Sequence, residues 1–297
     1  MAYSSRAVER QAKLALRKLR AFLDAAEPRL VYFLVNLWKD QGDAITYKEL
    51  REAILVGEIS EDYLAEWRED YSRFVTKRLL PEWEKAMAAA ADSINADHPD
   101  WKYNPSAIGM YDWIQTRGAE FVTSVSETQI EGLRAVIRNA ATLHTMSVDE
   151  LARAIRPMVG LTLQQSIANL RYYEKLIGNG IKPKRALDLS IRYGARQHRY
   201  RAFMISRTEL AFGYNKGMYE GVKQAQKDGY VGEARKVWAT ALDERVCDYC
   251  RTLEGKEIAL DDEFDFKTKL TSPGIKLMPP AHVNCRCTTL ILTSPPK

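Results

Sequence analysis

Five residues near the C-terminus are of the types that bind a soft metal ion. Cys247 and Cys250 form a CxxC pair, and further along the chain His282 is followed by Cys285 and Cys287. Thiolate and imidazole donors favour zinc over magnesium or calcium, and two such clusters can converge on one tetrahedral ion. These are all four cysteines of the chain, so their grouping indicates one local site rather than a distributed set of disulfides.

We predict a structural zinc ion bound by Cys247, Cys250, His282 and Cys285. The spacing of His282 and Cys285 repeats that of the CxxC pair. Cys287 would lie on the same strand face as Cys285, which makes it the alternative ligand. A pair of disulfides, or reduced cysteines in a small core, stay open as alternatives. Thiols that start reduced in a cytosolic assembly favour the metal.

A catalytic zinc ion fits the sequence less well. Such a site needs an open coordination position and a general base nearby. Glu244 and Glu254 flank the CxxC pair, but carboxylates of this kind are common on protein surfaces. We therefore expect no catalytic residues.

The elements that position these residues are predicted mainly to be helices. From residue 5 to about 235, apolar residues recur at three- and four-residue steps. An aromatic stripe from Leu64 to Trp83 is expected to be core, with a kink at Pro81. Capping boxes predict helix starts at Thr46 with Glu49, Ser147 with Glu150, and Thr162 with Gln165. This body should contain no sheet larger than a hairpin.

The last part of the chain follows a different pattern. β-branched and apolar runs at 237–240 and 288–292 predict two or three short strands around the cysteines. The fold class is therefore mainly α, with a multi-helix body and a small C-terminal α+β unit like a zinc knot. A Pro-, Asn-, Asp- and Gly-rich segment at 98–109 gives another boundary. We predict three regions: 1–105, 106–235 and 236–297.

The composition and the apolar segments indicate the general class of protein. Hydrophobic residues make up 46% and charged residues 28% of the chain, as in soluble globular proteins. The longest apolar run, from Leu30 to Trp38, is far short of the ~20 residues that span a bilayer, and we expect no membrane partner. The N-terminus has no apolar segment of the kind found in secretory signals.

The densest positive charge lies between Lys182 and Arg207, where Asp188 is the sole carboxylate. Five of these residues are predicted to bind double-stranded DNA through its phosphates, without sequence specificity: Lys184, Arg185, Arg192, Arg196 and Arg199. The alternative is a solvated face. For the N-terminal helix, with basic residues at Arg10, Lys13, Arg17 and Lys18, we favour the solvated face.

Three motifs in the second half of the chain resemble the phage head morphogenesis proteins related to Mu protein F. The first, from Arg201 through Arg207-Thr-Glu209, leads to Asn215 and Gly217. The second runs from Trp238 to the CxxC pair, and the third is Pro279-Pro-Ala-His282-Val-Asn-Cys285-Arg-Cys287. The resemblance covers residues 150–292. Val283 replaces the proline that usually follows the histidine.

The resemblance implies a minor head protein of a tailed bacteriophage, present in few copies at the portal vertex. Such proteins enter the prohead during assembly and in some phages influence DNA packaging or ejection. The implied partners are the portal protein, other capsid or scaffolding proteins, and DNA. The implied location is the head interior, and the host cytoplasm during assembly. Arg207, Glu209 and Asn215 are expected to be structural, with Arg207 and Glu209 packing the helix against the cysteines.

Two other functions compete with this interpretation. A metal-dependent DNA nuclease would use His282 and Asn284, but the other histidines, His98, His144 and His198, lie in unrelated segments. A zinc-ribbon DNA-binding protein would suit the cysteines and the basic stripe, but not the motifs around Arg207 and Pro280. We therefore expect a protein that is not an enzyme.

Overall fold

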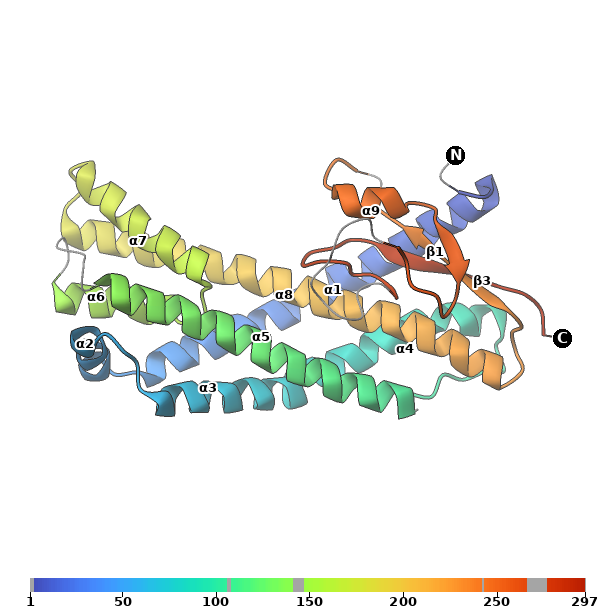
Figure 1. Cartoon of the computed structure of the whole chain (residues 1–297), viewed down its shortest axis with the longest axis horizontal. Helices are drawn as coiled ribbons and strands as arrows, with labels where there is room; N and C mark the ends of the chain where they lie inside the picture. Colours follow the sequence, from blue (N-terminus) through green and yellow to red (C-terminus); the bar gives the residue numbers. More distant parts are fainter. Residues whose placement is uncertain (1–2, 106–107, 141–146, 242, 266–276, 297) are drawn as a thin grey trace. The chain divides into compact units, whose positions relative to one another are not determined.

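The computed structural model describes residues 3–105, 108–140, 147–241, 243–265 and 277–296. Its elements are, in order, α1 (Arg6–Ala44), α2 (Tyr47–Val56), α3 (Glu61–Phe74), a π-helical turn (Val75–Leu79), α4 (Leu80–Asp97), α5 (Ile108–Ala140), α6 (Val148–Ile155), a 3-10 turn (Arg156–Met158), α7 (Leu163–Gly178), α8 (Pro183–Lys227), β1 (Ala234–Ala239), α9 (Asp248–Leu253), β2 (Glu257–Ala259) and β3 (Thr288–Thr293). The predicted mainly α fold with a small C-terminal α+β unit is confirmed (Figure 1).

Spatial contacts divide the chain into two compact units. The sheet unit comprises Met1–Pro28, Leu79–Ile114 and Met204–Lys297, and the helical unit comprises Arg29–Arg78 and Gln115–Phe203. Each unit therefore combines segments that are far apart in sequence. The predicted boundaries at residues 105 and 235 mark changes of pattern along the sequence, not groups of spatial contacts. They stay a prediction.

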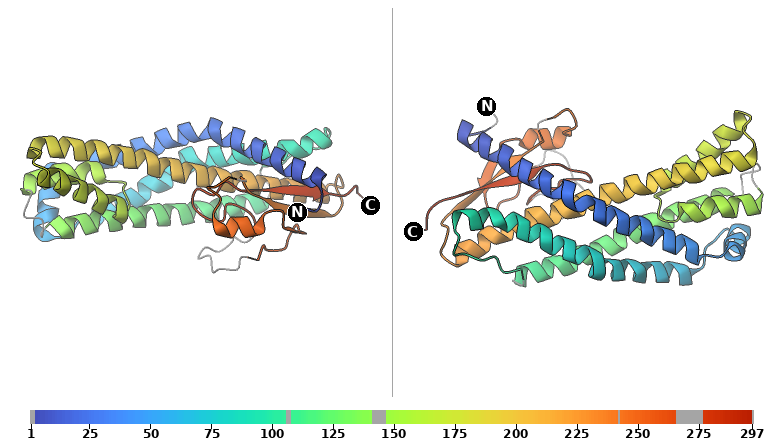
Figure 2. Two further views of the ribbon diagram at one scale, coloured as in Figure 1. Left: turned by 90° about the horizontal axis from the view of Figure 1, so that it is seen from above. Right: turned by 180° about the vertical axis from the view of Figure 1, so that it is seen from behind.

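The helical unit begins its helices at the predicted capping boxes. At Thr46, Ser147 and Thr162, each hydroxyl accepts a hydrogen bond from the backbone N–H three residues later, and the side chain at that position accepts one in return. The helices enclose one large apolar core, and α2 lies beside α6 (Figures 1 and 2). Local sequence thus fixes where these helices start, and apolar burial packs them.

A polar network crosses the core of the helical unit. The indole N–H of Trp38 donates to Tyr71 Oη at 2.7 Å, and Tyr71 in turn donates to Gln129. Arg201 is buried and donates to Thr128 Oγ1 at 2.7 Å and to the backbone carbonyl of Gly160. Because these buried polar groups form hydrogen bonds, their burial does not carry the cost of an unpaired polar group.

The long aromatic helix departs from a regular α-helix just before Pro81. The π-helical turn Val75–Leu79 separates α3 from α4, and Pro81 stands in the first turn of α4. Because proline lacks a backbone N–H, it interrupts the regular hydrogen-bond ladder of a continuous helix. The structure thus has a π-helical segment ahead of the proline, and the kink at Pro81 stays a prediction.

In the sheet unit, α4 and α8 pack closely at a glycine. A Cβ built on Gly217 would lie 2.3 Å from the Met87 Cα, closer than any real contact. Only glycine therefore fits at this point of α8. The small residue in the motif after Arg207 allows two helix backbones to approach each other.

The three strands form an antiparallel sheet in the order β2-β1-β3. Val237 and Ala239 of β1 pack on Ala12 of α1, whereas Trp238 lies on the other face, in the core that contains the cysteines. In Figure 2, α1 crosses one face of the sheet. Both predicted strand segments are confirmed, and α1 covers the face opposite the cysteines.

Within the described part of the chain, no helix combines the length and the hydropathy needed to cross a membrane.

Candidate metal centre

Two tight turns present the ligand-type side chains. Cys247 caps the N-terminus of α9, where its sulfur accepts a hydrogen bond from the Cys250 N–H at 3.4 Å. In the second turn, the Cys285 N–H donates to the His282 carbonyl at 3.1 Å, and Asn284 has a positive φ of 60°. Asparagine is among the few residues that adopt this conformation readily. Each turn therefore directs two ligand atoms to one side.

The ligand atoms converge at distances that suit a tetrahedral ion. His282 Nε2 lies 3.1 Å from Cys247 Sγ and 3.5 Å from Cys250 Sγ, and Cys250 Sγ lies 3.8 Å from Cys285 Sγ. With Zn–S bonds of about 2.3 Å and Zn–N bonds of about 2.0–2.1 Å, tetrahedral geometry places two sulfurs about 3.8 Å apart and sulfur and nitrogen about 3.5 Å apart. The cluster of Cys247, Cys250, His282, Cys285 and Cys287 can therefore hold a metal ion.

Hydrogen bonding orients the His282 ring for this role. Its Nδ1 lies 2.9 Å from the Val283 carbonyl oxygen, and because a carbonyl only accepts, Nδ1 carries the proton. In the neutral ring Nε2 is then the free ligand atom, and it is the nitrogen that faces the sulfurs.

Without a cation, the cluster already stabilises a thiolate. A hydrogen bond with Cys250 lowers the pKa of Cys285, and the same contact raises the pKa of Cys250. A hydrogen bond with Cys285 raises the pKa of His282 to about 9. A bound metal ion would replace that proton, since metal binding to thiolates and imidazole displaces protons.

The fifth donor, Cys287, is buried, as Cys250 and Cys285 are. It groups with Cys250 and Cys285, whereas His282 groups with Cys247 and Cys250. Cys285 Sγ lies 3.8 Å from Cys250 Sγ. The structure thus brings the five predicted donors into two groups of three that share Cys250, with His282 in the group that contains the CxxC pair.

An ion pair ties the two halves of the cluster together. Arg286 donates to both carboxylate oxygens of Asp243 at 2.6 Å, and the Arg245 N–H donates to the same carboxylate at 3.0 Å. The guanidinium group holds the pKa of Asp243 below its usual range. Asp243 precedes the CxxC pair and Arg286 follows Cys285. The ion pair between them therefore holds together two segments that are distant in sequence.

Helix α8 anchors the second turn and the strand that follows it. Thr208 Oγ1 accepts a hydrogen bond from the Asn284 N–H at 2.9 Å. Asn215 is fully buried, and its Oδ1 accepts from Thr288 Oγ1 at 2.9 Å and from the Thr289 N–H at 3.1 Å. Asn215, one of the predicted structural residues, therefore ties α8 to β3.

The other two residues predicted to be structural have different contacts. Arg207 donates to both carboxylate oxygens of Glu27 on α1, at 2.6 and 3.0 Å. Glu209 is buried, and its backbone carbonyl accepts from the Trp83 indole. Sequence reasoning missed Glu27 and Thr208, because their partners are distant in sequence and no spacing pattern connects them.

The five residues predicted to bind DNA share one property on α8. All of them are exposed, and none forms an ion pair within the described part of the chain: Lys184, Arg185, Arg192, Arg196 and Arg199. Nearby His198 faces the interior, where its Nε2 lies 2.8 Å from the Val159 carbonyl oxygen and its ring packs against Trp38. The histidine is thus core, and the arginines face solvent.

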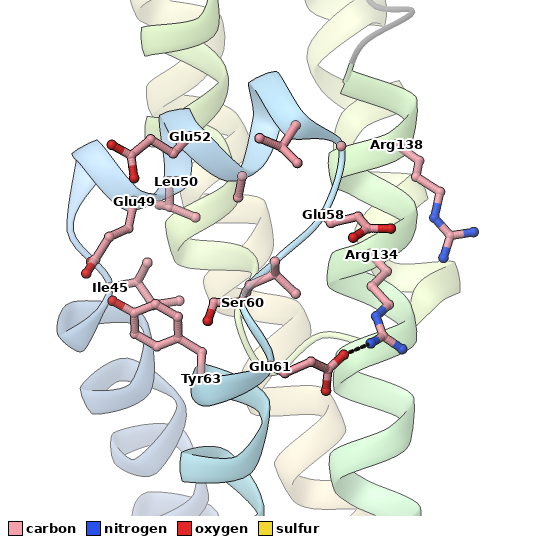
Figure 3. A pocket seen from close by; sticks show the side chains of 14 residues that line it. Ile45, Glu49, Leu50, Glu52, Glu58, Ser60, Glu61, Tyr63, Arg134 and Arg138 are labelled. Atoms are coloured by element: carbon pink, nitrogen blue, oxygen red, sulfur yellow. Dashed lines mark hydrogen bonds and ion pairs between the residues drawn. The ribbon is translucent and has the colours of Figure 1, made fainter.

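A larger groove lies in the helical unit, between α2, the start of α3 and the end of α5 (Figure 3). Four glutamates line it: Glu49, Glu52, Glu58 and Glu61. Glu49 completes the cap of α2, and Glu61 pairs with Arg134 at 2.6 Å. These two carboxylates therefore serve local structure.

Residues 146–290, just under half of the chain, match the family described as Phage Mu protein F like protein. This part of the chain is similar to that family. The match confirms the resemblance seen in the motifs, and it contains all five donors of the cluster. None of the curated proteins and none of the solved structures compared with the chain matches it.

Proposed function

We propose that the protein is a minor head protein of a tailed bacteriophage that acts at the portal vertex, in head morphogenesis and in DNA packaging or ejection. The family match over residues 146–290 carries this proposal. The portal protein and other capsid or scaffolding proteins are the proposed partners, and the N-terminal region, 1–105, is the candidate contact. The proposed location is the head interior, with assembly in the host cytoplasm.

Purified proheads and mature particles test this assignment. We expect the protein in both, in few copies, and cross-linked to the portal protein when intact proheads are treated with a short amine-reactive reagent. A protein absent from both particles, while abundant in the lysate, would exclude a role in the head. Retention in particles without a portal cross-link would leave the head role standing and remove the portal contact.

We propose further that the cluster holds one structural zinc ion through Cys247, Cys250, His282 and Cys285. The tetrahedral separations support this ligand set. Cys250 and Cys285 are each 1% exposed, and Cys247 and His282 are half-buried, so most of the ligand set is shielded from solvent. A closed site of this kind supports folding rather than catalysis, and we assign the protein no enzymatic activity.

The α8 surface is the proposed DNA contact. Three exposed arginines, Arg192, Arg196 and Arg199, recur at helical spacing and would neutralise phosphates. Changing all three to Ala should lower DNA affinity and reduce the slope of log affinity against log salt by roughly 0.9 per lost contact. Fluorescence anisotropy with a labelled random duplex measures both quantities.

A matched variant controls for the loss of three positive charges. Lys39, Lys77 and Arg153 are exposed basic residues of the same unit outside α8. Their triple Ala variant should keep the parental slope. An unchanged slope in the α8 variant would mean that the arginines only solvate the helix.

A further inference from the structure

The first part of α1 carries a continuous basic stripe. Its members recur at alternating steps of four and three residues: Arg6, Arg10, Lys13, Arg17 and Arg20. With Lys18, residues 6–20 contain six basic side chains and one acidic side chain, Glu9, a net charge of +5. The whole chain also has a net charge of +5. The net charge of residues 6–20 is therefore as large as the net charge of the whole chain.

The structure places the stripe on the exposed side of α1. The opposite side buries Ala12, Leu19 and Leu23, each at most 3% exposed. Every basic residue of the stripe is exposed. The apolar half of the helix is thus used in the fold, and the basic half faces solvent.

Most of this charge is not neutralised within the protein. Lys13 pairs with Glu9 at 2.6 Å, and Arg20 Nε lies 3.7 Å from Asp24. Both are exposed pairs between neighbouring helical turns, which are weak. Arg10 and Arg17 form no ion pair with any described residue.

A helix face that only solvates usually mixes charges of both signs. The second half of α1 has that character, with acidic residues Asp40 and Asp43 beside Lys39. The basic stripe in the first half, interrupted only by the charge of Glu9, extends over 14 helical steps, a length of about 21 Å at 1.5 Å per residue. A polyanion with negative charges spaced along its length would complement this line of basic side chains.

Between two polyanionic partners, the burial of α1 favours nucleic acid over a membrane surface. A helix that binds at a membrane surface inserts its apolar face among the lipids. In this protein, that face already packs on the sheet through Ala12, Val237 and Ala239. Guanidinium groups, in contrast, bind phosphates from an exposed face without apolar insertion.

We propose that the basic stripe of α1 binds the phosphate backbone of double-stranded DNA. This inference rests on the proposed role at the DNA-filled head, and it adds a second contact surface, independent of α8. Binding is electrostatic, without sequence preference and strongly dependent on salt. Arg10 and Arg17, the unpaired members near the middle of the stripe, provide the contacts.

The full-length double variant Arg10→Gln/Arg17→Gln tests the proposal. Glutamine is a good helix former, so α1 should be retained, as far-UV circular dichroism can verify. Fluorescence anisotropy with a random duplex should show weaker binding, and the slope of log affinity against log salt should fall by roughly 0.9 for each lost contact. The control Lys102→Gln/Lys227→Gln removes two exposed charges from the same unit and should keep the parental slope.

The outcomes separate this stripe from the α8 surface and from other partners. An α1 variant with the parental slope overturns the proposal, as does an equal loss in the control. If the α8 triple variant keeps its slope while the α1 variant loses it, the stripe stands and the α8 contact fails. If the α1 variant binds DNA normally but no longer binds vesicles of 30% phosphatidylserine in phosphatidylcholine, the stripe is a membrane contact instead.

Discussion

The core of the helical unit and the small core around the cysteines are stabilised differently. The helical core gathers large side chains such as Trp67, Ile137 and Leu170 from several helices. The cysteine core has few large apolar side chains, chiefly Trp238, Leu253 and Phe264, beside three thiols. A fully buried large apolar side chain contributes about 1.5–3 kcal/mol. We therefore expect the helical core to absorb a local loss, and the cysteine core to depend on the proposed zinc ion and on its polar contacts.

The largest expected effect follows from removing one ligand. Cys250→Ser should abolish metal binding, and with it a contribution on the order of 10 kcal/mol to folding of the region around β1–β3. Hydrogen exchange should show lost protection in β1, α9 and β3, while α2, α3 and α7 keep theirs. Elemental analysis of wild-type protein, purified under reducing conditions without chelator, should give one zinc ion per chain.

Cys287→Ser provides the matched control, because Cys287 is the donor that the proposed ligand set leaves out. This variant should keep its zinc and its exchange protection. A wild-type protein that lacks zinc and is still protected at β1 and β3 would show that the cysteines are packed or paired as disulfides. Loss of zinc in Cys287→Ser would instead exchange the roles of Cys285 and Cys287.

The same comparison explains how much the sequence could predict. Helix starts in the helical unit depend on neighbours three residues apart, so the capping residues Thr46, Ser147 and Thr162 were all identified correctly. The strands and the convergence of the cysteines were also predicted, since CxxC spacing and β-branched runs are local patterns.

Contacts between distant segments could not be predicted in this way. Glu27 binds Arg207 across 180 positions, and Thr208 binds the Asn284 backbone across 76. A carboxylate or hydroxyl on a helix surface has the same local pattern whether it meets solvent or a partner. For the same reason the helical spacing around Arg196 and Arg199 does not show that the ring of His198 lies inside, against Trp38.

A second, intermediate effect concerns that histidine and should be confined to the helical unit. Burial lowers the pKa of His198 to about 4 from 6.5, with Arg201 nearby adding to the decrease. Between these pH values the unfolded chain binds more protons than the folded chain, so stability falls as the pH is lowered. From pH 7 to pH 5 the helical unit should lose about 2 kcal/mol.

Hydrogen exchange in α7 and in residues 183–203, corrected for its intrinsic pH dependence, measures this loss. His198→Gln removes the titrating group but keeps a donor for the Val159 carbonyl. It should show a smaller decrease between pH 7 and pH 5 than the wild type. An equal decrease in both proteins would assign the acid sensitivity to other groups.

The smallest expected effect is the loss of one helix cap. Thr162 Oγ1 accepts from the Gln165 N–H at 3.3 Å, and Gln165 Oε1 accepts from the Thr162 N–H at 3.1 Å. Thr162→Ala removes the hydroxyl and should destabilise the helical unit by about 1 kcal/mol. Thr162→Ser keeps the cap and should cost less, because only a methyl group is lost. Because α7 is also held by Leu170 and Tyr173 in the large core, Thr162→Ala should fray its first turn and leave the rest protected. If exchange instead showed all of α7 exposed, the helical core would be as dependent on single polar contacts as the cysteine core, and the distinction between the two would fail.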